Sequence, residues 1–225
     1  MIIITGAASG IGSHLFNLFE QKEFVIGTYH LTDNGNKKLM KLDIKNYDEV
    51  AHWSSLLDFT PMERLILINC AGINYNSFAH KSDPKEWHNV IETNLMGTYN
   101  VIRTILPHMR EKGFGRIINF GSVVTQRFVP GTSAYTASKL ALRGLTKTLA
   151  IENASKGITI NDINLGYSNI GMGITQITEN QKKELNTLIP SGRFCEPEEI
   201  VSTIEYLISN AYINGSAIDL NGALY

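Results

Sequence analysis

Short apolar runs alternate along the chain with longer segments whose apolar residues recur every three or four positions. The first run, Ile2–Thr5, carries no polar alternation, which is typical of a parallel strand buried on both faces. Further strands are expected at Phe24–Tyr29, Leu42–Ile44, Leu65–Ile68, Arg116–Gly121, Ile158–Ile163 and Ala217–Leu220.

The segments between these runs predict helices. Asn46 and Glu49 have the spacing of a capping box for a helix that continues through Leu57. Asp83 followed by Pro84 predicts the start of a long helix. That long helix is expected over Pro84–Arg110. Two further helices are expected over Ala134–Ser155 and Pro197–Ser209. Strictly alternating strands and helices predict an α/β fold: a single domain over residues 1–225 with a Rossmann-like, doubly wound parallel sheet of about seven strands and helices on both faces.

Two connections depart from a regular alternation. Only about a dozen residues, including the polar stretch LTDNGNKK, separate Phe24–Tyr29 from Leu42–Ile44. A crossover with a full helix needs at least that many residues, so we expect this helix to be reduced or absent. The glycine-punctuated segment Gly166–Leu188 is expected to form a lid over a cleft.

Composition narrows the class of partner. The 225 residues are 43% apolar and 18% charged, with a formal net charge of -1, which argues against nucleic acid or a membrane as the main partner. The start of the chain does not resemble a secretory signal. Cys70 and Cys195 have no zinc spacing, so no metal site and a cytoplasmic location are expected.

A glycine-rich turn directly follows the first strand. It reads Gly6-Ala-Ala-Ser-Gly10-Ile-Gly12 and leads into a segment of helical periodicity. Strand, glycine turn and helix are the context of a dinucleotide-binding site, in which Gly6 permits the turn, Gly10 lets the backbone approach the pyrophosphate, and Gly12 lets helix and strand pack closely. The alternative is a glycine turn in some other α/β protein.

A second group of candidate residues lies between Ser122 and Lys139. Tyr135 and Lys139 are four positions apart, so they share one face of a helix. An ammonium beside a phenol is expected to lower the phenol's pKa and favour acid–base chemistry. Ser122 ends an apolar strand, where its hydroxyl would reach a substrate oxygen. Asn94 lies on the apolar face of the long helix, as a core residue or a catalytic one.

Together these motifs resemble the short-chain dehydrogenase/reductase family, and within it most closely the β-ketoacyl-carrier-protein reductases. The resemblance covers essentially the whole chain. It rests on Thr5-Gly6-x3-Gly10-x-Gly12, Asp43, Asn69-x-Ala71-Gly72, Asn94, Ser122, Tyr135, Lys139, Pro190–Arg193, Pro197–Glu199 and Ile213–Gly215.

The resemblance implies a role for each matching residue. Tyr135 would exchange the proton on the substrate oxygen, Ser122 would polarise the carbonyl, and Lys139 would hold the nicotinamide ribose. Asn94 would hold a water that links Lys139 to solvent. The cofactor-binding residues are expected to be Gly6, Ser9, Gly10, Ile11, Gly12, His30, Asp43, Ile44, Asn69, Ala71, Gly72, Tyr135, Lys139 and Gly166.

Three features depart from the family pattern. Leu165-Gly166 stands where the family has proline-glycine, and Ile170 stands where a threonine usually grips the nicotinamide carboxamide. Ser168 or Asn169 are the candidate substitute donors. The third departure is the short connection after the second strand.

We therefore expect an NAD(P)-dependent oxidoreductase that acts on a carbonyl/secondary alcohol pair, with a 3-oxoacyl, carrier-protein-bound substrate first. A sugar or small polar alcohol is the alternative substrate, and a non-catalytic dinucleotide sensor or scaffold is the alternative class. NADP(H) is favoured over NAD(H) because Thr28-Tyr29-His30 lacks a carboxylate, with His30, Lys37 and Lys38 as phosphate ligands. Apolar or small residues around the two long helices predict a homo-oligomer, with a tetramer expected first.

Overall fold

Seven parallel strands form one sheet in the computed structural model, which describes residues 1–175 and 177–225. The strand order is β3-β2-β1-β4-β5-β6-β7, so the chain reverses its direction of winding between β3 and β4. This confirms the Rossmann-like doubly wound fold. The strands are β1 Ile2–Thr5, β2 Val25–Tyr29, β3 Leu39–Lys41, β4 Ile66–Asn69, β5 Gly115–Phe120, β6 Ile158–Leu165 and β7 Ala217–Leu220.

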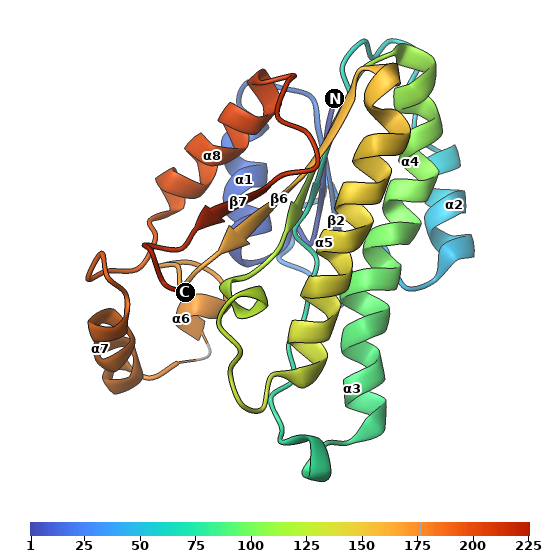
Figure 1. Cartoon of the computed structure of the whole chain (residues 1–225). Coiled ribbons are helices and arrows are strands. Elements are labelled where there is room, and N and C mark those ends of the chain that lie inside the picture. The colour runs from blue at the N-terminus through green and yellow to red at the C-terminus, as the bar shows by residue number, and fades with distance from the viewer. Residues whose placement is uncertain (176) are drawn as a thin grey trace.

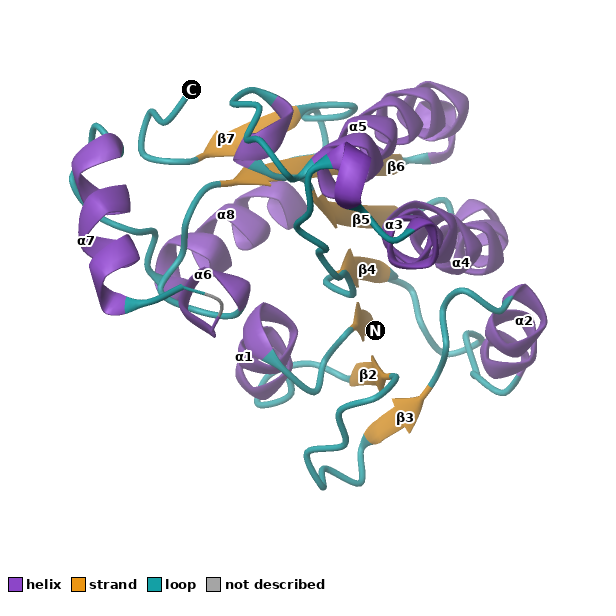
Figure 2. Ribbon diagram, turned by 90° about the horizontal axis from the view of Figure 1, so that it is seen from below, coloured by secondary structure: helices purple, strands orange, loops and turns teal. Residues whose placement is uncertain are grey.

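Helices cover both faces of the sheet, as Figure 2 shows. One face carries α1 (Gly10–Phe19) and α8 (Pro197–Ser209), with α6 (Met172–Thr175) and α7 (Glu179–Leu188) on the same side of the molecule. The opposite face carries α2 (Tyr47–Ser55), α3 (Pro84–Ile91), α4 (Thr98–Lys112) and α5 (Ser133–Asn153). In the described part of the chain, no helix has the length and apolarity needed to cross a membrane.

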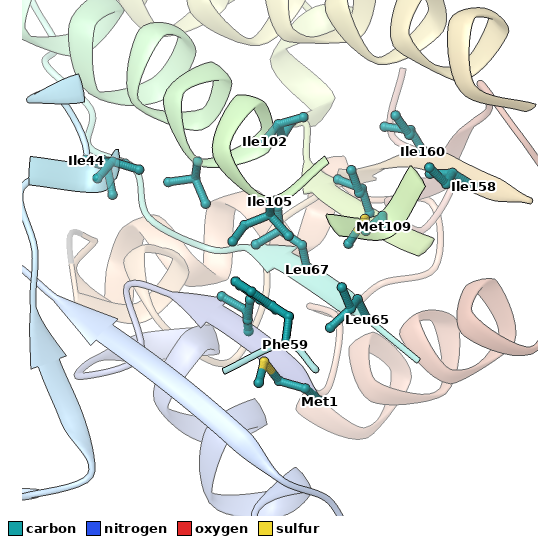
Figure 3. Close-up of a cluster of buried hydrophobic side chains, with 14 of the residues drawn as sticks. Met1, Ile44, Phe59, Leu65, Leu67, Ile102, Ile105, Met109, Ile158 and Ile160 are labelled. Carbon is teal, nitrogen blue, oxygen red and sulfur yellow. The ribbon is translucent and has the colours of Figure 1, made fainter. Parts of the chain in front are cut away.

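The strands are mostly apolar because each side of the sheet is buried under helices. Ile3, Leu67, Ile117 and Ile160 are mutual register partners on four adjacent strands and belong to the core cluster under α4 and α5 (Figure 3). Their strand neighbours point the other way. Ile2, Ile4, Ile66, Ile68 and Ile118 pack with α1 and α8.

The predicted third strand is displaced in the structure. β3 occupies Leu39–Lys41, before the expected Leu42–Ile44, because the ladder with β2 ends where Tyr29 pairs with Lys41. Leu42 already turns away, and its side chain enters the core. The expected absence of a helix before β3 is confirmed, since residues 30–38 are irregular.

The predicted capping box of α2 is only half formed. The Asn46 side chain accepts hydrogen bonds from the backbone of Asp48 and Glu49, as expected. The Glu49 carboxylate accepts from the Asp43 backbone N–H at 2.8 Å instead of returning to Asn46. The acid therefore ties the helix to the turn that follows β3.

The predicted long helix Pro84–Arg110 contains a break in its hydrogen-bond pattern. Glu92–Gly97 forms a π-helical turn between α3 and α4, which together look like one rod beside α5 in Figure 1. A π turn inserts an extra residue into the helical ladder and is often found at functional sites. Asn94 lies within it.

Candidate active site

A cleft of about 260 Å³ opens where the sheet changes winding direction, beside the carboxyl ends of β1, β2 and β4. Open α/β sheets bind ligands at this position. Seven of the predicted cofactor-binding residues line it: Gly6, Ser9, His30, Asp43, Ile44, Ala71 and Gly72.

Ten further residues line the same cleft and were not predicted as cofactor-binding. Asn89 and Thr93 lie four positions apart on one helical face. Two polar residues at that spacing could have been recognised in the sequence as a pair that faces the same side. Lys45 is part of the cleft lining because the chain turns toward the cleft after β3. The others are Ala8, Thr28, Tyr29, Leu31, Thr32, Leu42 and Ile73.

The glycine turn is shaped to receive a phosphate group. Gly6 has φ 67°, and a Cβ on it would lie 2.9 Å from the Ala71 backbone nitrogen. A Cβ on Gly12 would collide with the Gly6 carbonyl oxygen. Helix α1 begins at Gly10 with no side-chain cap from Ser9 and no acid in its first turn. Its first N–H groups and its dipole therefore suit a pyrophosphate, and the residues present fit a dinucleotide.

The lid expected at Gly166–Leu188 comprises α6, α7 and their connections, apart from residue 176, which lies outside the described residues. It reaches the glycine turn, since a Cβ on Gly10 would lie 3.0 Å from Gly171 Cα. Ser168 Oγ donates to the Ile170 carbonyl at 3.0 Å, and Asn169 Nδ2 donates to Glu196 at 2.7 Å. Both candidate carboxamide donors are thus engaged within the protein.

One end of the cleft places the Asp43 carboxylate between two basic side chains. Asp43 Oδ2 lies 3.6 Å from His30 Nε2 and 4.0 Å from Lys45 Nζ. Lys38, expected near a 2′-phosphate, instead forms a 2.7 Å ion pair with Glu20. Neither Lys37 nor Lys38 is among the residues that line the cleft.

Ser122 and Tyr135 meet at the carboxyl end of β5. Ser122 follows the strand and caps the short 3₁₀ turn Val123–Thr125, while Tyr135 lies in the first turns of α5. Desolvation raises the pKa of the Tyr135 phenol, and its interaction with the Ser122 hydroxyl opposes that shift.

Lys139 lies one helical turn beyond Tyr135 and is buried. Its Nζ donates to the Phe120 carbonyl at 2.7 Å and lies 5.5 Å from the centre of the Tyr135 ring. Burial lowers the pKa of this ammonium to about 8. The expected lowering of the phenol's pKa is therefore wrong for this structure, because desolvation of the phenol outweighs the other influences on it.

Asn94 joins the loop after β4 to helix α5. Its Nδ2 donates to the Ile73 carbonyl at 2.8 Å and to Ser138 Oγ at 3.1 Å, and its Oδ1 accepts from the Ile73 N–H. A Cβ on Gly72 would lie 3.3 Å from Asn94 Oδ1 and 3.8 Å from Lys139 Nζ. The fold thus brings Asn94 and Lys139 to the same loop.

Seven predicted cofactor residues are not part of the cleft lining: Gly10, Ile11, Gly12, Asn69, Tyr135, Lys139 and Gly166. Of these, Asn69 and Gly166 are held by contacts elsewhere in the sheet region. Asn69 turns its side chain to Asn119, with a 2.8 Å hydrogen bond. Gly166 lies against the end of β7, where a Cβ would come within 2.8 Å of Asn221 Cα. Asn69 therefore contacts β5, and Gly166 contacts the residue that follows β7.

Comparison with known proteins identifies the family to which the chain belongs. Residues 1–182 match the model of the short chain dehydrogenase family. An acetoacetyl-CoA reductase of Rhizobium meliloti is 34% identical over 99% of this chain and 97% of its own length. A 3-oxoacyl-[acyl-carrier-protein] reductase of Haemophilus influenzae is 33% identical, with the same coverage of both chains.

A solved structure shows the same architecture. The ligand-free aldohexose dehydrogenase of Thermoplasma acidophilum superposes with a TM-score of 0.89 and 26% identity, over 99% of this chain and 92% of that one. With the glycine turn, the cleft at the change of winding and the Ser122, Tyr135 and Lys139 group, these findings agree on one conclusion: the chain belongs to the short-chain dehydrogenase/reductase family and is an NAD(P)-dependent oxidoreductase of carbonyl substrates.

Proposed function

We propose that this protein reduces the 3-oxo group of an acyl thioester, carried on coenzyme A or on an acyl carrier protein. The observation that carries the proposal is the placement of Ser122, Tyr135 and Lys139 together at the carboxyl end of β5. The names of two full-length relatives, a 3-oxoacyl-[acyl-carrier-protein] reductase and an acetoacetyl-CoA reductase, support the substrate class.

The residues act as follows in this proposal. Ser122 donates a hydrogen bond to the substrate carbonyl, and Tyr135 gives its proton to the same oxygen as negative charge develops there. A phenol with a raised pKa is protonated at neutral pH, which is the form needed for reduction. Lys139 holds the nicotinamide ribose. With Asn94 next to it, Lys139 also relays a proton from solvent to replace the one that Tyr135 gives up. The bound nicotinamide supplies the hydride.

We further propose that NADP(H) is preferred. No carboxylate stands at Thr28–His30, so the acid that usually repels a 2′-phosphate is missing from these positions. Asp33, whose carboxylate accepts a hydrogen bond from the Tyr29 hydroxyl at 3.3 Å, reduces this advantage.

Of the three candidate phosphate ligands, His30, Lys37 and Lys38, only His30 lines the cleft, and Lys38 is paired with Glu20. Lys45 is a further basic side chain in the lining. Asp43 competes for His30, so the expected preference is moderate: about tenfold in Kd.

Fluorescence titration with NADPH and NADH tests the cofactor preference. His30→Ala should weaken NADPH binding and leave NADH binding nearly unchanged. Lys38→Ala is the matched control, since its loss breaks only an exposed ion pair with Glu20. Tighter binding of NADH by the unmodified protein would contradict the proposal.

The aldohexose dehydrogenase neighbour favours a second substrate class, a sugar or small polar alcohol. A panel assay separates the possibilities: NADPH oxidation with acetoacetyl-CoA and with 3-oxoacyl carrier protein, and NAD(P)⁺ reduction with aldohexoses. The proposal requires the highest kcat/KM with a thioester. Turnover of aldohexoses alone would establish the second class, and cofactor binding without turnover of any compound would establish a non-catalytic sensor or scaffold.

We also propose a homo-oligomer, most simply a tetramer, in the cytoplasm. Tyr99 on α4 and Leu140 and Ile151 on α5 expose apolar side chains. These two neighbouring helices lie on the same face of the sheet. Apolar surface of this kind is expected to be covered by a second copy.

A further inference from the structure

A row of polar side chains crosses the sheet directly behind the candidate active site. Thr5, Asn69, Asn119 and Asp162 are register partners on the adjacent strands β1, β4, β5 and β6. Each stands two residues after a core residue of the row formed by Ile3, Leu67, Ile117 and Ile160. Since side chains alternate along a strand, the polar row points to the face that α5 covers. The core thus becomes polar where the chemistry is expected.

Hydrogen bonds connect three members of this row through helix α5. Asn69 Nδ2 donates to Asn119 Oδ1 at 2.8 Å, and Asn119 Nδ2 donates to Thr146 Oγ1 at 2.9 Å. The Thr146 hydroxyl then donates to Asp162 Oδ1, also at 2.9 Å. All four side chains are buried. Asp162 is the end of this chain and its only ionisable member.

Asp162 is unusual because a carboxyl rarely stands inside a buried strand. It is 1% exposed, and its second oxygen, Oδ2, has no hydrogen-bond partner among the described residues. Burial raises the pKa of this carboxyl to about 7, against the hydrogen bond from Thr146 and the charges of Lys139 and Arg143. Burying a carboxyl with an unpartnered oxygen destabilises the folded state, so we expect this side chain to serve a function.

The charge of Asp162 acts on the candidate active site. Lys139 and Thr146 are seven positions apart on α5, so they lie on the same face of the helix, which packs against β6. Burial lowers the pKa of Lys139, and Asp162 is the strongest influence that raises it. Among the described residues, the other ionisable groups that face this pair are Arg143, Cys70 and Tyr135.

We propose that Asp162 is a positioning residue for the reaction: a buried counter-charge that keeps the Lys139 ammonium charged at the pH where the enzyme works. The inference rests on the roles proposed above for Lys139 and Tyr135. Asp162 touches neither substrate nor cofactor in this proposal and acts only through Lys139. An ammonium with a pKa near 8 is only partly charged at the upper end of the physiological pH range. The neighbouring carboxylate therefore affects the fraction of Lys139 that is protonated.

The test is the pH profile of kcat/KM for the oligomeric enzyme, measured with the best substrate of the panel. Asp162→Asn keeps the shape and an acceptor for Thr146 but removes the charge. The alkaline limb, where activity falls as Lys139 loses its proton, should move to lower pH by about one unit. Thr159→Val, at another buried position of β6, is the matched control and should leave the limb in place.

A second variant decides the matter if Asp162→Asn does not fold. Thr146→Val removes the donor that stabilises the Asp162 carboxylate, so Asp162 stays protonated to higher pH and supports Lys139 less. Its alkaline limb should also move down, by a smaller amount. A folded Asp162→Asn enzyme, or a folded Thr146→Val enzyme if that is the only one obtained, whose limb coincides with the parent's overturns the proposal.

Lys139→Met separates this proposal from the one it rests on. If Lys139→Met keeps the parent's activity, the role proposed for Lys139 fails, and the role of Asp162 fails with it. If Lys139→Met abolishes activity while the charge-removing variant leaves the alkaline limb unmoved, only the proposal for Asp162 fails.

Discussion

Asn94 and Ile73 are joined by two hydrogen bonds of 2.8 Å, one in each direction between the amide side chain and the peptide groups of Ile73. The pair forms at the π-helical turn Glu92–Gly97 and pins the loop after β4 to the helix. Gly72, the preceding residue of that loop, lines the cofactor cleft. The geometry of the cleft therefore depends on a side chain that points into the protein.

Asn94→Ala should lower the free energy of unfolding by about 2–3 kcal/mol, because it leaves partly buried peptide groups of Ile73 without partners. It should also weaken cofactor binding, since the loop loses its anchor. Asn89→Ala is the control on the same helix: it breaks one contact with Lys45 and should cost less than about 1 kcal/mol. Urea unfolding monitored by circular dichroism measures both variants, and equal losses would refute the anchoring role.

Gly12→Ala should abolish tight cofactor binding. A Cβ at this position would overlap the Gly6 carbonyl oxygen, a backbone atom that cannot rotate away, so the glycine turn must move. We expect a loss of about 1–3 kcal/mol in stability and at least about tenfold in cofactor Kd. Asn17→Ala, on the exposed side of α1, is the control and should change neither. A Gly12→Ala protein that binds NADPH normally would contradict the role of this turn.

The sequence predicted those features of the fold that depend on one local pattern. Apolar runs marked the strands because both faces of the sheet are covered, and the glycine turn was recognisable because each glycine meets a backbone atom. The third strand was misplaced by a few residues because its extent is set by its partner β2, which no local pattern records. The π-helical turn was missed for the same reason, since Asn94 kept its place on an apolar helical face.

The fold brings the predicted catalytic side chains near one another, but the ionisation behaviour and ion pairs differ from the expectation. Ser122, Tyr135 and Lys139 came together as their spacing indicated. The direction of the Tyr135 pKa shift was wrong, because desolvation depends on the packing of distant segments. Lys38 was expected at the cofactor and is engaged by Glu20, which is near only in the folded chain. Asp162 was overlooked, although a carboxyl inside the run ITINDINL was a visible signal.

Asp162 should also make stability depend on pH. Its pKa is raised from an ordinary value near 4 to about 7 in the folded state, so the folded protein binds the extra proton and wild-type stability falls as pH rises through that range. Asp162→Asn lacks this loss. Its free energy of unfolding relative to the wild type should therefore rise by about 2–3 kcal/mol between pH 5 and pH 8. A difference that is constant across this range would show that Asp162 does not titrate as the fold implies.

The oligomer should depend on the apolar surface of α4 and α5. Light scattering at micromolar concentration is expected to give the mass of a tetramer, or at least a dimer. Ile151→Glu introduces a charge at an 82% exposed apolar position of α5 and should reduce the mass. Leu56→Glu, exposed at the end of α2, should not change it. A monomer at these concentrations would overturn the proposal.

Tyr135 is the residue on which the proposed chemistry depends most. Tyr135→Phe removes the phenol hydroxyl and keeps the ring that lies near Lys139. Loss of the general acid should reduce kcat by at least about 10²-fold, while NADPH still binds with nearly the parent's affinity.

The deciding measurement is NADPH oxidation with acetoacetyl-CoA, followed at 340 nm in parallel with NADPH titration, for the wild type and Tyr135→Phe. We expect turnover by the wild type, no more than about a hundredth of it in Tyr135→Phe, and equal NADPH affinity. A Tyr135→Phe enzyme that retains most of the wild-type kcat would show that another group supplies the proton and would contradict the proposed active site.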